Sequence, residues 1–313
     1  MISSVMQKIE TTPLTLPYFD LEAFRAIEPM SARFKASMGE INEKTAQEYG
    51  LEPEHVPEIT LAQFQAGRYI ARKMEQMGMS NVRAVELSGI DKTMLSKYLK
   101  GKRPFTPSAS VVAPFCYNVM GESCNKIMLG FEGEIVLPSM YAETAKALSL
   151  IAPEEKAELL KKAKIQLALY EKQNPNEIKY APKRDLSVLI GERIFELIYD
   201  KGTQGYQLFG AETPYPVRNF LRQFIIEDFK RESPRLGHLM YLSLETGLAL
   251  DYFIAEDFTR YTPCYYTDGD QTILIEDREI LQYIGICSAV PSEQRAKLFG
   301  DAIGALLGQQ FTA

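Results

Sequence analysis

The sequence predicts an all-α protein in which a five-helix module occurs twice, with additional connecting helices. Apolar residues recur at helical spacing through most of the 313 residues. Candidate strands are few and short, at 133–137 and 271–275, and fit either small ladder pieces or extended connectors. Segments of residues 61–170 recur in the same order within 186–310, which is the pattern of an internal duplication.

Three pairs of segments carry the evidence for duplication. The turn that leads into Met79 matches the one before Thr203. The stretch from Thr106-Pro to Gly121 recurs from Ser233-Pro to Gly247, and residues 148–160 recur as 286–299, each with a proline before the second helix. Turn-rich segments then divide the chain into an N-terminal helical arm (1–60), the first module (61–131), a helical connector (132–182), the second module (183–260) and a C-terminal helical segment (261–313).

Composition places the chain among water-soluble proteins. It is 46% hydrophobic and 24% charged, and no apolar run approaches the roughly 18 residues that span a bilayer. Its first residues lack the features of a secretion signal. The four cysteines have no metal-ligand spacing, and buried free thiols in a reducing compartment are expected. A cytoplasmic location, with no metal and no cofactor, is the prediction.

Each helix of the first module has local signals. Gly78 ends a helix whose apolar face includes Phe64, Ile70, Met74 and Met77, and Ser80 is placed to cap the next helix. Small residues, Ala84, Val85 and Ser88, are expected to face inward there. Gly89 then supplies the positive φ of a tight turn.

The third helix is expected over residues 91–100. Ile90 should enter the core and Asp91 should cap this helix, with its charge at the favourable end of the helix dipole. Its inward stripe consists of Leu95, Tyr98 and Leu99. A fourth helix starts at Thr106-Pro107, and Pro114 should bend it.

Polar and basic side chains cover the opposite side of the third helix. Lys92, Thr93, Ser96 and Lys97 are the candidates for contacts with base edges in a DNA major groove. Phosphate contacts are expected from Asn81, Lys100, Lys102 and Arg103. From 61 to 130 ten basic residues oppose four acidic ones, a net charge of +6 in a chain whose total is −6. A solvated lysine face is the plain alternative, but a basic island in an acidic protein favours a local DNA-binding surface.

Residues 67–130 resemble the lambda repressor/Cro-type helix-turn-helix family (XRE). The strongest match is the stretch from Val85 to Arg103, followed by the Pro-Ser and Met-Gly-Glu-Ser segments. The resemblance implies a lambda-repressor-like module, a sequence-specific DNA-binding transcription regulator associated with the nucleoid, and a homodimer on two half-sites. Two departures are Asn81, where Gln is commoner, and Pro114 inside the fourth helix.

The second module looks degenerate in the same positions. Pro214, Tyr215, Arg218 and Asn219 replace the four base-reading candidates, and 222–229 replaces the basic loop with an apolar and acidic one. From 189 to 258 seven basic residues oppose eleven acidic ones, a net charge of −4 that a phosphate backbone would repel. A structural or dimerisation role is therefore expected, with Phe224, Ile225, Ile226 and Phe229 either in the core or at a subunit contact.

Other functions have less support. No catalytic triad, phosphate-binding loop or dinucleotide fingerprint is present, so no enzyme is predicted. A protein-interaction scaffold or antitoxin-like partner that retains the same fold is the alternative. The aromatic segment 261–266 fits loop residues over a core or, less commonly, a pocket for an effector that the sequence does not identify. The helix expected over 20–48 could extend a dimer contact or pack on its own module.

Overall fold

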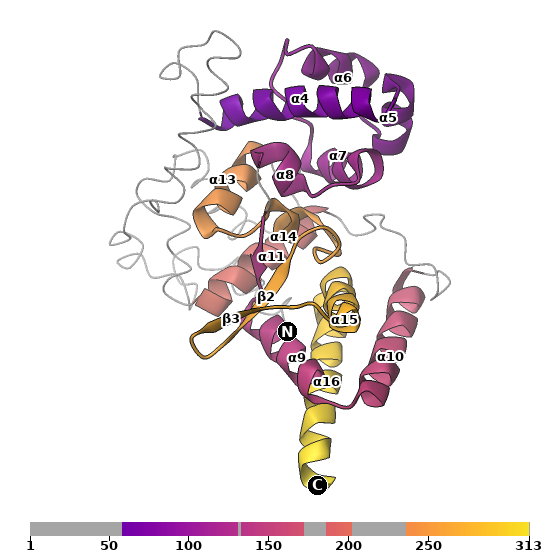
Figure 1. Cartoon of the computed structure of the whole chain (residues 1–313), viewed down its shortest axis with the longest axis vertical. Coiled ribbons are helices and arrows are strands. Elements are labelled where there is room, and N and C mark those ends of the chain that lie inside the picture. Colours follow the sequence, from indigo (N-terminus) through magenta and orange to yellow (C-terminus); the bar gives the residue numbers. More distant parts are fainter. Residues whose placement is uncertain (1–57, 131–132, 172–185, 202–235, 313) are drawn as a thin grey trace, which may run out of the picture. The chain divides into compact units, whose positions relative to one another are not determined.

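The chain is mostly helical, but a three-stranded sheet interrupts the all-α pattern that the sequence predicts. The computed structural model describes residues 58–130, 133–171, 186–201 and 236–312 (Figure 1). The chain divides into two compact units. Unit 1 combines residues 1–133 with 185–254, and unit 2 combines 134–184 with 255–313.

The first half of unit 1 follows the helix order expected from sequence. Its elements are α4 (Glu58–Gln76), α5 (Asn81–Ser88), α6 (Lys92–Leu99), α7 (Ala109–Pro114), a π-helical segment (Phe115–Met120) and α8 (Cys124–Leu129). The predicted caps are confirmed. Ser80 Oγ accepts a hydrogen bond from the Arg83 N–H at 3.2 Å, and Asp91 Oδ1 accepts one from the Met94 N–H at 2.9 Å. Gly89 has a φ of 73°, as its turn requires.

Most of the predicted inward residues are buried. They include Ile70, Met74, Ala84, Ser88, Ile90, Leu95 and Tyr98. Phe64, Val85 and Leu99 are only partly buried. The prediction for Met77 is wrong: α4 ends at Gln76, so Met77 leaves the register of the apolar face and is 45% exposed.

Helices α4 and α6 approach each other closely at Gly67. A Cβ added to this residue would lie only 2.9 Å from the carbonyl oxygen of Tyr98. The Tyr98 ring packs edge-on against Phe105, with 5.2 Å between centroids, and Phe105 continues to Phe115 at 5.6 Å. The back of α6 is thus fixed by backbone proximity and by an aromatic cluster.

The expected break at Pro114 takes the form of a change in helix type. α7 ends at this proline, and the chain continues as the π-helical segment 115–120 up to Gly121. Proline cannot donate the backbone hydrogen bond that a continuous α-helix needs, so the altered bonding pattern begins where the donor is missing.

The second half of unit 1 is described in part. It contains α11 (Leu186–Lys201), α13 (Leu236–Thr246) and α14 (Leu250–Ile254). The predicted replacements Pro214, Tyr215, Arg218 and Asn219, the segment 222–229 and nearly all of the N-terminal arm lie outside the described residues.

Unit 2 joins two segments with similar element order. The first gives β1 (Ile135–Val136), α9 (Ser139–Leu150) and α10 (Pro153–Glu171); the second gives β2 (Cys264–Asp268), β3 (Gln271–Leu274), α15 (Arg278–Ala289) and α16 (Ser292–Thr312). β1 pairs in parallel with β2, and β2 pairs antiparallel with β3. Both candidate strands of the sequence are confirmed. β2 is not among them, and it occupies part of the aromatic segment that the sequence places in a loop.

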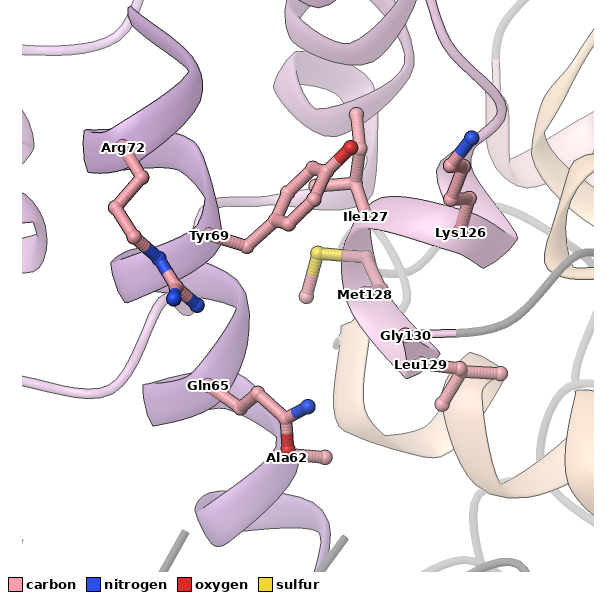
Figure 2. Close-up of a pocket in the computed structure, with 9 residues that line it drawn as sticks. All are labelled: Ala62, Gln65, Tyr69, Arg72, Lys126, Ile127, Met128, Leu129 and Gly130. Carbon is pink, nitrogen blue, oxygen red and sulfur yellow. The ribbon is translucent and has the colours of Figure 1, made fainter. Parts of the chain in front are cut away.

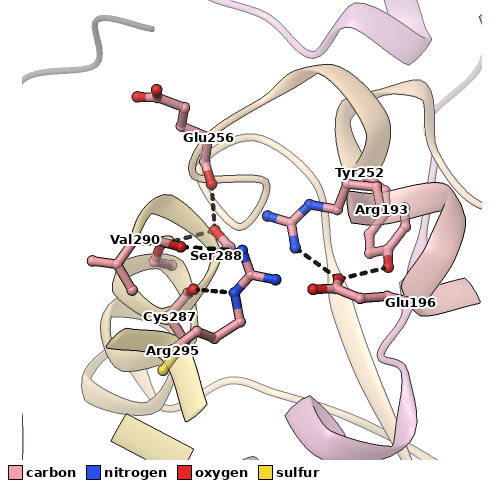
Figure 3. Close-up of polar contacts among 9 residues, drawn as sticks. Arg193, Glu196, Tyr252, Glu256, Cys287, Ser288, Val290 and Arg295 are labelled. Atoms are coloured by element: carbon pink, nitrogen blue, oxygen red, sulfur yellow. Dashed lines mark hydrogen bonds and ion pairs between the residues drawn. The ribbon is translucent and has the colours of Figure 1, made fainter. Parts of the chain in front are cut away.

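The helices of unit 2 pack across the two segments. α9 lies against α16, and α10 lies against α15. The Tyr141 ring stands between Phe258 and Phe299, at centroid distances of 5.5 and 5.0 Å. Arg295 is buried, and its Nε donates to the Cys287 carbonyl at 2.9 Å, so this guanidinium satisfies the C-terminal end of α15 (Figure 3).

Candidate nucleic-acid interface

Helices α5 and α6 with their short turn form the candidate interface. The turn consists of Gly89, Ile90 and Asp91, which supply a left-handed cap, a core side chain and a helix cap in that order. α6 is anchored from behind by Leu95 and Tyr98, which are 0% and 4% exposed. The opposite side of α6 is therefore held in a fixed orientation towards solvent.

The four base-reading candidates share this outward side. Lys92 and Thr93 are exposed in the first turn of α6, and Ser96 and Lys97 are partly exposed one turn later. Because residues four apart lie on one side of a helix, the structure brings all four together. We call these four residues the reading face. It offers two ammonium groups and two hydroxyls, which suit acceptors on base edges.

The phosphate candidates flank the reading face along the chain. Asn81 is exposed as the first residue of α5. Lys100, Lys102 and Arg103 are exposed in the segment after α6, which we call the basic loop. Backbone bonds shape this loop: the Gly101 N–H donates to the Tyr98 carbonyl at 3.0 Å and the Lys102 N–H donates to the Lys97 carbonyl at 2.9 Å. Gly101, with a φ of 63°, permits the turn.

The cations of this surface differ from those on neighbouring helices. Within the described part of the chain, no carboxylate forms an ion pair with Lys92, Lys97 or the three cations of the basic loop. By contrast, Lys73 and Lys126 both pair with Glu122, which also accepts from the Tyr69 hydroxyl. Partial burial opposes ionisation of Glu122, but the bonds from Lys73 and Tyr69 outweigh it and lower its pKa. The basic charge of α6 and its loop is thus left for a partner.

A hollow of about 170 Å³ lies between α4 and α8. Figure 2 shows the Tyr69 ring and the Met128 thioether facing the space between these two helices. Its lining residues are Ala62, Gln65, Tyr69, Arg72 and 126–130. None of them belongs to α5 or α6, so the hollow is separate from the reading face.

The cysteines behave as the composition indicates. All four are free and buried. Burial raises the pKa values of the Cys124 and Cys287 thiols, which makes these sulfurs poor nucleophiles. No group of three or more potential metal ligands occurs among the described residues. In the same part of the chain, no helix has both the length and the apolar character to cross a bilayer.

Sequence reasoning missed a buried polar cluster between α8 and α14. Asp251 accepts from the backbone N–H groups of Cys124 and Asn125, and Asn125 accepts from the backbone N–H of Leu250. The signal was available in the repeat, because Asn125 and Asp251 each follow the equivalent glycine by four residues. What the sequence did not reveal is that the two equivalent residues meet.

The second module contains a buried arginine. Arg193 of α11 is fully buried, pairs with Glu196 at 3.1 Å and lies over the Tyr252 ring at 5.4 Å (Figure 3). A buried guanidinium serves the core of this module and is closed to a phosphate backbone. Among the described residues of unit 1, the exposed cations that no carboxylate pairs with include those of α6 and its loop. No family model, curated protein or solved structure matches the chain.

Proposed function

We propose that this protein is a sequence-specific DNA-binding transcription regulator that places α6 in the major groove. The observation that carries the proposal is the reading face itself. Two lysines and two hydroxyl residues lie together on the free side of a helix whose other side is sealed by Leu95 and Tyr98. A helix of this kind, preceded by a tight turn and a supporting helix, is the arrangement by which many regulators reach base edges.

Two roles are assigned within the interface. The reading face selects bases, since hydroxyl and ammonium groups can distinguish acceptor patterns in the major groove. Asn81 and the basic loop hold phosphates, which adds affinity without sequence preference. The net charge of +6 over residues 61–130 favours this assignment.

The family assignment belongs to the same proposal. The confirmed caps and turn, together with the sequence resemblance, support a lambda-repressor-like module in the first half of unit 1. The second module keeps helices but carries a net charge of −4 over residues 189–258, which supports a structural role for it. Association with the nucleoid follows from DNA binding.

Selection of bound duplexes from a random pool, at two salt concentrations, tests the proposal. A recovered motif is expected at both, and Ser96→Ala and Lys97→Ala should each reduce discrimination between the motif and its single-base variants. The loss should be about 5- to 150-fold for a position read by a bidentate contact. Lys162→Ala on α10, which removes one exposed lysine from unit 2, is the matched control.

Two outcomes would contradict the proposal. One is failure to retain any duplex at low salt, which together with a stable complex with another protein would favour the scaffold or antitoxin-like alternative. The other is equal loss of affinity for the motif and for random DNA when Ser96 or Lys97 is replaced, which would remove base reading from α6.

A further inference from the structure

The two modules of unit 1 meet through equivalent residues. Gly121 and Gly247 both have positive φ, 65° and 71°, and both stand just before the last helix of their module. Counting from these glycines makes Cys124 equivalent to Leu250 and Asn125 equivalent to Asp251. The same count makes Tyr117 equivalent to Ser243.

The hydrogen bonds between the modules are reciprocal. Asp251 Oδ1 accepts from the Cys124 N–H at 2.9 Å, and Asn125 Oδ1 accepts from the Leu250 N–H at 2.9 Å. Each side chain thus caps the first turn of the other module's last helix. The equivalent hydroxyls lie at the same contact: Tyr117 donates to Asp251, and Ser243 Oγ lies 3.2 Å from Asn125 Oδ1 while its shorter bond, at 2.6 Å, goes to the Leu248 carbonyl.

This contact is buried and closely packed. Asn125 and Asp251 are each 1% exposed, and Leu250 and Phe253 beside them are fully buried. A Cβ added to Gly133 would come within 2.6 Å of Ala249 Cβ. Polar groups that are buried and mutually satisfied fix one arrangement, since separating them would leave donors and acceptors without partners.

Identical subunits related by a two-fold axis make reciprocal contacts: if residue i of one subunit meets residue j of the other, then j of the first also meets i of the second. The bonds of Asn125 and Asp251 follow this pattern between the two modules. We infer that the α8–α14 contact is such a subunit interface contained within one chain, with the second module in the place that a second copy would take. This inference rests in part on the proposed function: because the sequence of the second module has Pro214, Tyr215, Arg218 and Asn219 in place of the four reading residues, one chain should bind a single DNA site without an inverted repeat.

The residue pair also explains why unlike modules pair. Asp251 crosses to the first turn of α8, and Asn125 crosses to the first turn of α14, so both side chains share one buried cluster. Pairing of two second modules would place two carboxylates in that cluster. Their repulsion without water would be severe, so an asparagine on one side and an aspartate on the other favours the pairing inside the chain over the pairing of two second modules.

The DNA arm of the test uses the full chain and the duplex recovered from the random pool. We expect a motif without an inverted repeat and a complex of one chain per duplex in native mass spectrometry. An inverted repeat that holds two chains would overturn the inference. If no duplex binds even at low salt, the proposed function fails, and the pairing of modules is decided by the second arm.

The second arm measures urea unfolding of Asn125→Asp, Asp251→Asn and the double variant. Asn125→Asp adds a second buried carboxylate, and Asp251→Asn turns an amide donor towards a backbone N–H, so each should lower the urea midpoint. The double variant has a single carboxylate again, and its midpoint should lie above that of Asn125→Asp. A double variant whose midpoint falls by the sum of the two single effects would overturn the reciprocal pairing. Asn118→Asp, an exposed asparagine of the π-helical segment, is the control.

A milder variant keeps the test decisive if the acidic variant does not fold. Tyr117→Phe removes the hydroxyl that donates from the first module to Asp251 of the second. It should lower the urea midpoint, and a wild-type midpoint would overturn the inference.

Discussion

Removing the three positive charges of the basic loop leads to a quantitative prediction for DNA binding. Lys100→Ala, Lys102→Ala and Arg103→Ala, combined in one variant, delete three exposed cations that no described carboxylate pairs with. None of the three is part of the core, and the backbone bonds that shape the loop remain. The variant should therefore fold as the wild type does and lose only its attraction for phosphates.

The expected magnitude follows from counterion release. Each phosphate contact contributes about 0.9 to the slope of log affinity against log salt, so three contacts contribute about 2.7. Between roughly 50 and 200 mM salt, this part of the slope corresponds to a change in affinity of about 40-fold. The variant should lose that part of the salt dependence on the selected motif and on random DNA alike.

Fluorescence anisotropy with a labelled duplex, repeated over a series of salt concentrations, measures this slope. Lys162→Ala on α10 should leave it unchanged. The reasoning would be refuted if the triple variant bound more weakly but kept the full wild-type slope. It would also be refuted if the variant changed which bases are preferred, because the loop would then be reading sequence.

Two further predictions concern the framework of the units. Gly67→Ala should destabilise unit 1 by about 1–3 kcal/mol, since the added Cβ would press on the Tyr98 carbonyl. Gly300→Ala, where a Cβ meets open space, should stabilise the protein by about 0.5–1 kcal/mol. Thermal unfolding should therefore show a lower midpoint for the first variant and a higher midpoint for the second. Asp277 caps α15 and pairs with Lys156; partial burial opposes its ionisation, but the bond from Lys156 outweighs it and lowers the pKa of Asp277. The stability from this group should be full above the ordinary Asp pKa and lost as the pH falls through the lowered pKa, and Asp277→Asn should flatten that part of a pH–stability curve.

Local signals made much of the first module predictable. A serine or aspartate three residues before the N–H that it caps, and a glycine at a left-handed turn, act within one helical turn, so Ser80, Gly89 and Asp91 could be assigned from the sequence. Strand β2 could not be assigned in the same way. Its pairing partner β1 is far away in the chain, and the residues of β2 do not alternate between buried and exposed, which is the pattern that marks a half-buried strand.

In the candidate site, too, features set by local sequence were predictable, and features set by contacts between distant segments were not. The outward side of α6 follows from helical periodicity, so the reading face could be named residue by residue. The cluster of Asn125 and Asp251 depends on two modules meeting, which periodicity does not report. Gly67 was missed for a similar reason, because its role depends on how closely α4 and α6 approach.

The two halves of the chain are interleaved in both units. Unit 1 takes residues 1–133 from the first half and 185–254 from the second, and unit 2 takes 134–184 and 255–313. In unit 1, a side chain from each half accepts a backbone hydrogen bond from a helix of the other half. In unit 2, α9 packs against α16, α10 packs against α15, and β1 pairs with β2. Since each half relies on the other for its core contacts, neither half has a unit of its own. Without the second module, the Cys124 and Asn125 N–H groups in the first turn of α8 would lose the Asp251 carboxylate that accepts from them, although Ser123 would still cap this helix. The second module is therefore required for the stability of the first, whatever its own contact with DNA.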